Sequence, residues 1–283
     1  MSTQVPRLLA GLVDDAAVFP PGSATLPDAV AAHRRHRGSW YADLVGPLLV
    51  PASALPALAG LLGADERIAV GVVADIPLDR LYEVRAGADP RIDIRQVEVA
   101  VAKRGEDPQP GLAALVAFAR STGLRAYAEV PLAFGLMGAL DALAAARAAG
   151  VPIAAKFRTG GLAAELFPTP VELAAVISAC RDRELPFKLT AGLHHAVRHL
   201  EPETGFTHHG FGNVLVATLT AVDGAEVDEV ATMLAATDPA RLVERARAAR
   251  DAVRPLWVGF GSCSIVEPLT DLIRLGLVNG GEE

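Results

Sequence analysis

Two lysines interrupt apolar segments of the chain at similar positions. Lys156 follows the apolar run Val-Pro-Ile-Ala-Ala, and Lys188 lies in a Phe-Lys-Leu-Thr segment 32 residues later. Each is followed within a few residues by threonine and glycine, in 159–161 and 190–192. A neutral lysine amine attacks carbonyl groups and forms Schiff bases. The pair therefore indicates carbonyl chemistry at the ends of two successive strands.

Acidic side chains interrupt other apolar runs in the same way. Glu98 lies in Gln-Val-Glu-Val-Ala, Glu129 lies in Ala-Tyr-Ala-Glu-Val, and Asp14 or Asp15 lies in the first run of the chain. Charges that point into a folded interior are costly unless they are paired, so a cluster of them is a candidate site. The alternative is structural: each acid could form a salt bridge, and a single lysine could be a solvated residue at a strand end.

The chemistry sets a condition on the lysine. Its ordinary pKa is about 10.4, and lowering it by about three units is worth about 4 kcal/mol. We expect nearby Lys188 and Arg158 to supply the positive charge that lowers the pKa of Lys156, while Glu98 and a water move protons. The planar guanidinium of Arg158 also suits a substrate carboxylate or phosphate. This predicts chemistry on a small, anionic carbonyl compound without a cofactor.

Short apolar runs alternate with helical segments along the whole chain, which is typical of βα units. The expected strands are Leu12–Phe19, Asp43–Val50, Arg67–Ala74, Arg95–Ala102, Leu124–Val130, Pro152–Arg158, Phe187–Thr190 and Leu256–Gly261. The expected helices are Pro27–His36, Ser53–Leu62, Asp79–Arg85, Gly111–Thr122, Met137–Ala149, Pro170–Asp182, Val214–Ala221, Val227–Ala236, Ala240–Val253 and Glu267–Leu275. Eight strands in such an order predict a single (β/α)8 barrel domain over residues 1–283.

Local signals refine this pattern. Ser53 and Thr169 are expected to cap helices, and Pro170 suits a first helical position. The stretch between the seventh and eighth strands is longer than one helix needs, so we expect a helical, His-rich insertion over about 193–253 beside the mouth of the barrel.

Composition narrows the class of partner. The 283 residues carry a formal net charge of −7, which disfavours nucleic acid and anionic membranes as partners and favours a small molecule. The two cysteines, Cys180 and Cys263, form no disulfide framework or metal motif, which predicts a reducing compartment. No apolar run is long enough for a membrane span, and the N-terminus lacks a secretory pattern, so we expect a cytoplasmic protein. We expect a homodimer only because dimers are the commonest oligomers.

The order of these motifs resembles the deoxyribose-phosphate aldolase family of class I aldolases, which are (β/α)8 barrels. Its Schiff-base segment Lys-Thr-Ser-Thr-Gly resembles 156–160, and its Lys-Ala-Ser-Gly-Gly segment resembles 188–192. Glu98 resembles the acid on the family's fourth strand, and 128–130 resembles its Ile-Glu-Thr. Residues 13–20 resemble its N-terminal Ile-Asp-His-Thr-Leu-Leu-Lys-Pro, and 49–51 resembles its Val-Asn-Pro. The resemblance implies a lyase of the aldolase type in which Lys156 forms the Schiff base and Lys188 and Glu98 assist it.

Departures from that family concern the substrate. Glu98 stands where the family has aspartate, Arg158 replaces a small hydroxyl residue, and Leu193-His194-His195 replaces a phosphate-binding Gly-Ile-Arg. These changes weigh against deoxyribose phosphate, although backbone amides after the eighth strand could still hold an anion. We expect the substrate to contact Asp14, Glu129, Arg158, Thr159, Thr190, Gly192, Gly261 and Ser262.

Two other interpretations stay open. Five histidines fall within sixteen residues: His194, His195, His199, His208 and His209. One from each adjacent pair, with Glu98 or Glu129, could bind a divalent metal such as zinc, for hydrolysis or a metal-assisted lyase reaction with the lysines binding an anion. The third interpretation is a non-catalytic barrel that binds a small molecule, because fold alone does not establish function.

Overall fold

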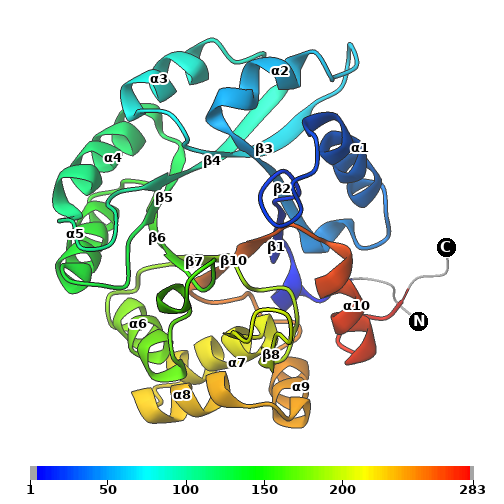
Figure 1. The fold of residues 1–283 in the computed structure, drawn as a ribbon, viewed down its shortest axis with the longest axis vertical. Coiled ribbons are helices and arrows are strands. Elements are labelled where there is room, and N and C mark those ends of the chain that lie inside the picture. Colours follow the sequence, from blue (N-terminus) through cyan, green and yellow to red (C-terminus); the bar gives the residue numbers. More distant parts are fainter. Residues whose placement is uncertain (1–4, 281–283) are drawn as a thin grey trace.

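The computed structural model describes residues 5–280, which form a closed barrel of eight parallel strands surrounded by helices (Figure 1). The strands are β1 (Val13–Asp15), β2 (Val45–Pro51), β3 (Ile68–Val73), β4 (Ile92–Ala100), β5 (Arg125–Glu129), β6 (Ile153–Arg158), β7 (Phe187–Thr190) and β10 (Trp257–Ser262). Each pairs with the next around the ring, and β10 closes it between β7 and β1. The predicted (β/α)8 barrel is confirmed.

Helices follow the strands in alternation and cover the outside of the barrel (Figure 1). They are α1 (Leu26–Arg37), α2 (Leu55–Ala59), α3 (Leu78–Ala86), α4 (Gln109–Thr122), α5 (Leu136–Ala148), α6 (Pro170–Asp182), α7 (Phe211–Val222), α8 (Val227–Ala235), α9 (Pro239–Ala248) and α10 (Val266–Arg274). Short 3-10 turns occur at Arg7–Leu9, Ala42–Leu44, Ala52–Ala54 and Ala164–Leu166.

The two predicted helix caps have different outcomes. Thr169 caps α6 in a full capping box, in which the Thr169 and Glu172 side chains each accept from the other residue's backbone amide. The prediction for Ser53 is wrong: α2 begins at Leu55, and Ser53 instead bonds through its backbone amide and its hydroxyl to Asp75. The first strand is also shorter than predicted, because the chain turns back after Asp15, where the Phe19 amide donates to the Ala16 carbonyl.

Alternation along the strands separates an apolar outer layer from a charged interior. On β6 and β7, Phe157, Phe187 and Leu189 are fully buried in the apolar core. Lys156 and Lys188 alternate with these residues and point to the other face, into the barrel. The outward side chains of these strands therefore pack in the apolar core, and the inward positions carry polar groups.

The stretch between β7 and β10 begins with a small hairpin that was not predicted. Its strands, β8 (His199–Leu200) and β9 (Thr207–His208), are antiparallel and too short to leave a periodic pattern. His208 Nδ1 lies 3.1 Å from the Gly192 carbonyl oxygen, just beyond the end of β7. Of the three helices that follow, α8 packs against α6 and α7, and α9 packs against α7. No helix within residues 5–280 combines the length and apolar character needed to cross a membrane.

Candidate active site

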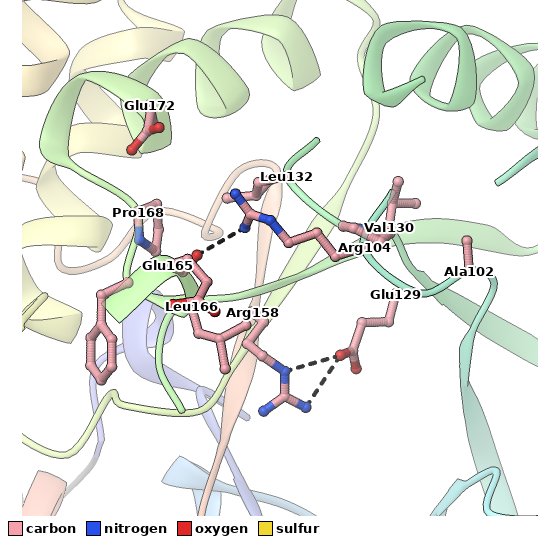
Figure 2. A pocket seen from close by; sticks show the side chains of 12 residues that line it. Ala102, Arg104, Glu129, Val130, Leu132, Arg158, Glu165, Leu166, Pro168 and Glu172 are labelled. Atoms are coloured by element: carbon pink, nitrogen blue, oxygen red, sulfur yellow. Dashed lines mark hydrogen bonds and ion pairs between the residues drawn. The ribbon is translucent and has the colours of Figure 1, made fainter. Parts of the chain in front are cut away.

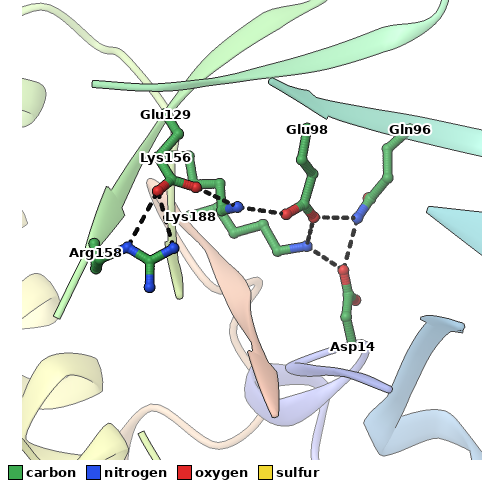
Figure 3. Close-up of polar contacts among 7 residues, drawn as sticks. All are labelled: Asp14, Gln96, Glu98, Glu129, Lys156, Arg158 and Lys188. Carbon is green, nitrogen blue, oxygen red and sulfur yellow. Dashed lines mark hydrogen bonds and ion pairs between the residues drawn. The ribbon is translucent and has the colours of Figure 1, made fainter. Parts of the chain in front are cut away.

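Six charged side chains form one chain of ion pairs across the barrel interior, which we call the ion chain (Figure 3). Cations and anions alternate along it in the order Arg158, Glu129, Lys156, Glu98, Lys188 and Asp14. Three positive charges therefore face three negative ones. Such mutual compensation is what allows so many charges to be buried together.

Lys156 lies in the middle of the ion chain, held by two carboxylates. Its Nζ is 2.8 Å from Glu98 Oε2 and 2.7 Å from Glu129 Oε2. Lys188 forms ion pairs with the other oxygen of Glu98 and with Asp14. Glu98 therefore bridges the two ammonium groups, one on each of its oxygens.

Strand register explains why these residues meet. Lys156 on β6 is the direct partner of Lys188 on β7, and Glu129 on β5 is the direct partner of Lys156. Residues in register on adjacent parallel strands point to the same face. The strand register therefore makes these three side chains neighbours, and Glu98 on β4 contacts both lysines.

Two uncharged residues contact the ion chain and were missed from the sequence. Gln96 Nε2 donates to Asp14 at 2.7 Å and to Glu98 at 3.1 Å, so a single amide group connects the two acids. The Lys188 ammonium lies 5.2 Å from the centre of the Tyr127 ring, within the range of a cation–π interaction. Gln96 lies two residues before Glu98 and Tyr127 two residues before Glu129, so strand alternation alone would have placed both on the inner face.

One glycine makes room for Asp14. A Cβ added at Gly46 on β2 would lie 1.9 Å from Asp14 Oδ1, so a larger residue would require this carboxylate to move. The ion pair with Lys188 identifies Asp14 as the interior acid of β1. The neighbouring Asp15 points elsewhere and pairs with the buried His33, 3.0 Å from its Nδ1.

Electrostatics keep the central groups of the ion chain ionised. Burial by itself raises the pKa of Glu98, but the two ammonium groups outweigh it and lower the pKa to about 2. Burial likewise lowers the pKa of Lys188, yet Asp14 and Glu98 reverse this and hold it above its ordinary value. Asp14, at the end of the ion chain, keeps a raised pKa because burial exceeds the effect of Lys188.

The prediction that neighbouring cations lower the pKa of Lys156 is wrong. Burial lowers it, but Glu98 and Glu129 more than compensate, and the pKa is raised. Arg158 and Lys188 each contact a carboxylate that lies between them and Lys156. Lys156 is therefore an ammonium here, and the carboxylates of Glu98 and Glu129 lie within hydrogen-bonding distance of its Nζ.

A cavity of about 250 Å³ opens beside one end of the ion chain (Figure 2). It lies at the C-terminal ends of β5 and β6, which is where active sites occur in (β/α)8 barrels. Glu129 and Arg158 line it, together with Arg104 and the apolar side chains of Leu132, Leu166 and Phe167. The Arg104 guanidinium spans part of the cavity and donates to the Glu165 carbonyl at 2.9 Å.

Exposure decreases stepwise from this cavity into the barrel. The side chains of Arg158 and Glu129 are 44% and 18% exposed, whereas those of Lys156 and Lys188 are 4% and 2% exposed. Of the two buried lysines, Lys156 is the one nearer the cavity, because it contacts Glu129, which lines the cavity.

The other predicted substrate contacts hold local structure. Thr159 Oγ1 donates to the Ala191 carbonyl at 2.6 Å and so ties the ends of β6 and β7 together. Ser262 Oγ donates to the Ser264 carbonyl at 2.7 Å. Thr190 and Gly261 are direct partners at the ends of β7 and β10, and Gly192 follows with a φ of +78°, which favours glycine. None of these five lines the described cavity.

The histidines of the alternative metal site have separate partners. His194 Nδ1 lies 3.0 Å from Glu267 Oε2, and His195 Nδ1 lies 3.2 Å from Asp271 Oδ2. His209 Nε2 lies 2.7 Å from the Pro168 carbonyl oxygen. His208 contacts the Gly192 carbonyl, while Glu98 and Glu129 are engaged with the lysines. Within residues 5–280, no group of three or more His, Cys, Asp or Glu side chains is arranged to hold a metal ion.

Comparison with protein-family models, with curated proteins and with solved structures finds no match to this chain. The assignment of function therefore depends on the residues themselves and on their geometry.

Proposed function

We propose that this protein is a class I lyase of the aldolase type, in which Lys156 forms a Schiff base with a small carbonyl compound. The observation that carries the proposal is the position of Lys156. Its buried amine is separated from the cavity by Glu129 and lies between two carboxylates, which in this proposal accept its proton. The resemblance of 156–160 and 188–192 to the lysine segments of deoxyribose-phosphate aldolases supports the same chemistry.

The choice of lysine supports the proposal further. The chain holds 26 lysines and arginines, of which only Lys103, Lys156 and Lys188 are lysines. Arginine is the usual partner for bidentate or buried ion pairs, but its guanidinium stays protonated and cannot act as a nucleophile. Two of the three lysines are thus placed in the barrel interior, where an amine can do what a guanidinium cannot.

Schiff-base formation balances without an external proton donor or acceptor. The Lys156 ammonium passes one proton to Glu129 or Glu98, and the neutral amine forms a C–N bond to the carbonyl carbon. The carbonyl oxygen then takes up that proton and a second one from the nitrogen, and leaves as water. The remaining protonated imine carries the positive charge that the ammonium carried before.

The protonated imine is the electron sink for the carbon–carbon step. In the cleavage direction, a base removes the proton of the β-hydroxyl, the C–C bond breaks to give an aldehyde, and its electrons form an enamine on Lys156. Glu98 is placed for proton transfer because it contacts both lysines. Lys188 and Gln96 then act as positioning residues that fix the Glu98 carboxylate.

Borohydride trapping tests the proposal. Wild-type protein is incubated with small aldehydes, ketones and 2-oxo acids, reduced, and weighed by intact-mass spectrometry. We expect an adduct of one substrate residue that Lys156→Arg abolishes, since this variant keeps a cation between Glu98 and Glu129 but has no reactive amine. Lys188→Arg should still form an adduct, more slowly. Absence of an adduct with every carbonyl would overturn the proposal.

A further inference from the structure

We propose that the carbonyl substrate is a 2-oxo acid, and that in this structure the Glu129 carboxylate occupies the site on Arg158 that the substrate's carboxylate takes. The inference rests on the proposed Schiff base at Lys156 and adds the class of substrate. It comes from the way in which Glu129 connects Lys156 to Arg158 (Figure 3).

A single carboxylate spans the two cations. Glu129 Oε2 lies 2.7 Å from Lys156 Nζ, and Glu129 Oε1 lies 3.3 Å from both Nε and Nη2 of Arg158. The ammonium and the guanidinium are therefore separated by the width of one carboxyl group. In a 2-oxo acid the reactive carbonyl carbon is bonded directly to the carboxylate carbon. When Arg158 holds that carboxylate, the carbonyl carbon comes to lie next to Lys156 Nζ.

This spacing discriminates between classes of anionic carbonyl compounds. In a sugar phosphate the phosphate is several bonds away from the carbonyl, so the two groups cannot both fit a gap that one carboxylate fills. In a neutral aldehyde nothing replaces Glu129 on the guanidinium. The geometry thus favours an anion adjacent to the carbonyl.

The contact between Arg158 and Glu129 leaves the guanidinium incompletely used. Nε and Nη2 of Arg158 reach the same oxygen of Glu129, each at 3.3 Å. This distance is longer than the 2.7–2.9 Å usual for charge-assisted hydrogen bonds. A free carboxylate could offer one oxygen to each of two donors in the bidentate arrangement that arginine prefers. Since Arg158 is 44% exposed beside the cavity, a substrate carboxylate can reach it and displace Glu129.

Charge balance then links binding to activation of Lys156. A substrate carboxylate on Arg158 brings a second negative charge next to Glu129, and a like charge raises the pKa of a carboxyl group. Glu129, which keeps its contact with Lys156, becomes the natural acceptor for the Lys156 proton. The local charges before binding are Lys156 plus, Glu129 minus and Arg158 plus. After proton transfer they are a neutral amine, a neutral Glu129, Arg158 plus and the substrate carboxylate minus, so the bound substrate generates the nucleophile that attacks it.

A matched pair of probes tests this inference. Pyruvate and its amide, pyruvamide, share the 2-oxo group and the shape but differ in charge. Each is incubated with the protein and cyanoborohydride, and the rate of adduct formation is followed by intact mass. We expect wild type to favour pyruvate by about 100-fold. Arg158→Gln should remove this preference, whereas Arg95→Gln, which breaks the exposed pair with Asp93 outside the cavity lining, should retain it.

A second measurement separates failure of the inference from failure of the proposed function. Pyruvate binding to Lys156→Arg, which cannot form an imine, is measured by calorimetry, with and without Arg158→Gln. Binding that depends on Arg158 supports the carboxylate site even if no imine forms in wild type. Adducts at Lys156 without any preference for pyruvate, or a preference that survives Arg158→Gln, would overturn the inference and leave the Schiff-base proposal intact.

Discussion

The barrel holds charged side chains at both ends of its strands, and it satisfies them in opposite ways. At the N-terminal end, Arg254 donates to the backbone carbonyls of Leu8, Trp257 and Val258 at 2.7–2.8 Å. Burial lowers the pKa of Arg254 to about 10, and the charge of Asp14 opposes this shift only in part. At the other end, carboxylates surround Lys156 and Lys188, and the pKa values of both are raised.

The two ends differ in the groups that contact the cation directly. The half-buried Arg254 contacts neutral carbonyl groups and joins the chain segments before β1 and at β10, while the charge of Asp14 also acts on it. Carboxylates add something that carbonyl groups lack, which is the capacity to accept a proton. The ion chain is also the end that borders the cavity. We therefore interpret the N-terminal end as structural and the ion chain as chemical.

The largest effect is expected from Glu98→Ala, which removes the anion shared by both lysines. Two buried ammonium groups would then lie side by side with less compensation, and the free energy of unfolding should fall by about 3–5 kcal/mol. Urea denaturation measures this. Glu83→Ala, which breaks an exposed ion pair with Arg80, is the control and should have little effect. Equal effects of the two substitutions would show that the ion chain is not electrostatically coupled.

Acid should weaken the ion chain and leave the carbonyl groups around Arg254 unaffected. The pKa of Glu98 is about 2 in the folded protein against 4.5 as the ordinary value, so its stabilising contribution is present above about pH 4.5 and is lost as the pH falls toward 2. Glu129, whose pKa is also lowered by Lys156 and Arg158 against the effect of burial, adds to this in the same direction. The contribution of Glu98 is on the order of 3 kcal/mol.

The measurement is urea unfolding at pH 6, 4 and 3. Wild type should lose stability over this range, and Glu98→Gln should lose clearly less, because its amide does not titrate. A fall of the same size in both proteins would assign the acid sensitivity to other carboxylates.

Arg254→Met should destabilise the fold without touching the chemistry. It leaves several backbone carbonyls without their donor, at a cost of about 2 kcal/mol. Denaturation should register this cost, while the rate of imine trapping at a temperature where the variant stays folded should match wild type. A large loss of trapping in folded Arg254→Met would contradict the division between a structural and a chemical end.

Gly46→Ala is expected to have the smallest effect on stability, about 1–2 kcal/mol from crowding. Its new methyl group would lie where Asp14 Oδ1 now lies, so Asp14 must move away from Lys188. In the Asp14→Ser background Gly46→Ala should cost less than it does in wild type, because the smaller side chain makes room. Additive effects in this double-mutant cycle would show that Gly46 does not act through Asp14.

Much of this arrangement follows from the sequence. Alternation of apolar runs and helical segments predicts the barrel, and the inner positions of its strands identify Lys156, Lys188, Glu98 and Glu129 together. Choosing between Asp14 and Asp15 required the structure, because β1 is only three residues long and all of its side chains are buried. An alternation of buried and exposed residues, which would show the face of each side chain, is absent from this three-residue strand.

The pKa of Lys156 could not be predicted, because it depends on which groups are in contact with it. From sequence, Lys188 and Arg158 are cations close to Lys156 on the same or the next strand. In space, Glu98 and Glu129 lie between them and reverse the expected shift. The cavity is likewise formed by loops after β4, β5 and β6, whose side chains carry no periodic signal.

Peptide mapping of the trapped wild-type protein tests the central claim most directly. The chain has three lysines, so a reduced adduct on a side-chain amine has three positions to occupy, and the exposed Lys103 reports nonspecific labelling. After incubation with pyruvate, reduction and proteolysis, we predict the adduct on Lys156, with Lys188 unmodified. An adduct carried by Lys188, or spread over Lys103 and the others, would contradict the assignment of Lys156 as the nucleophile.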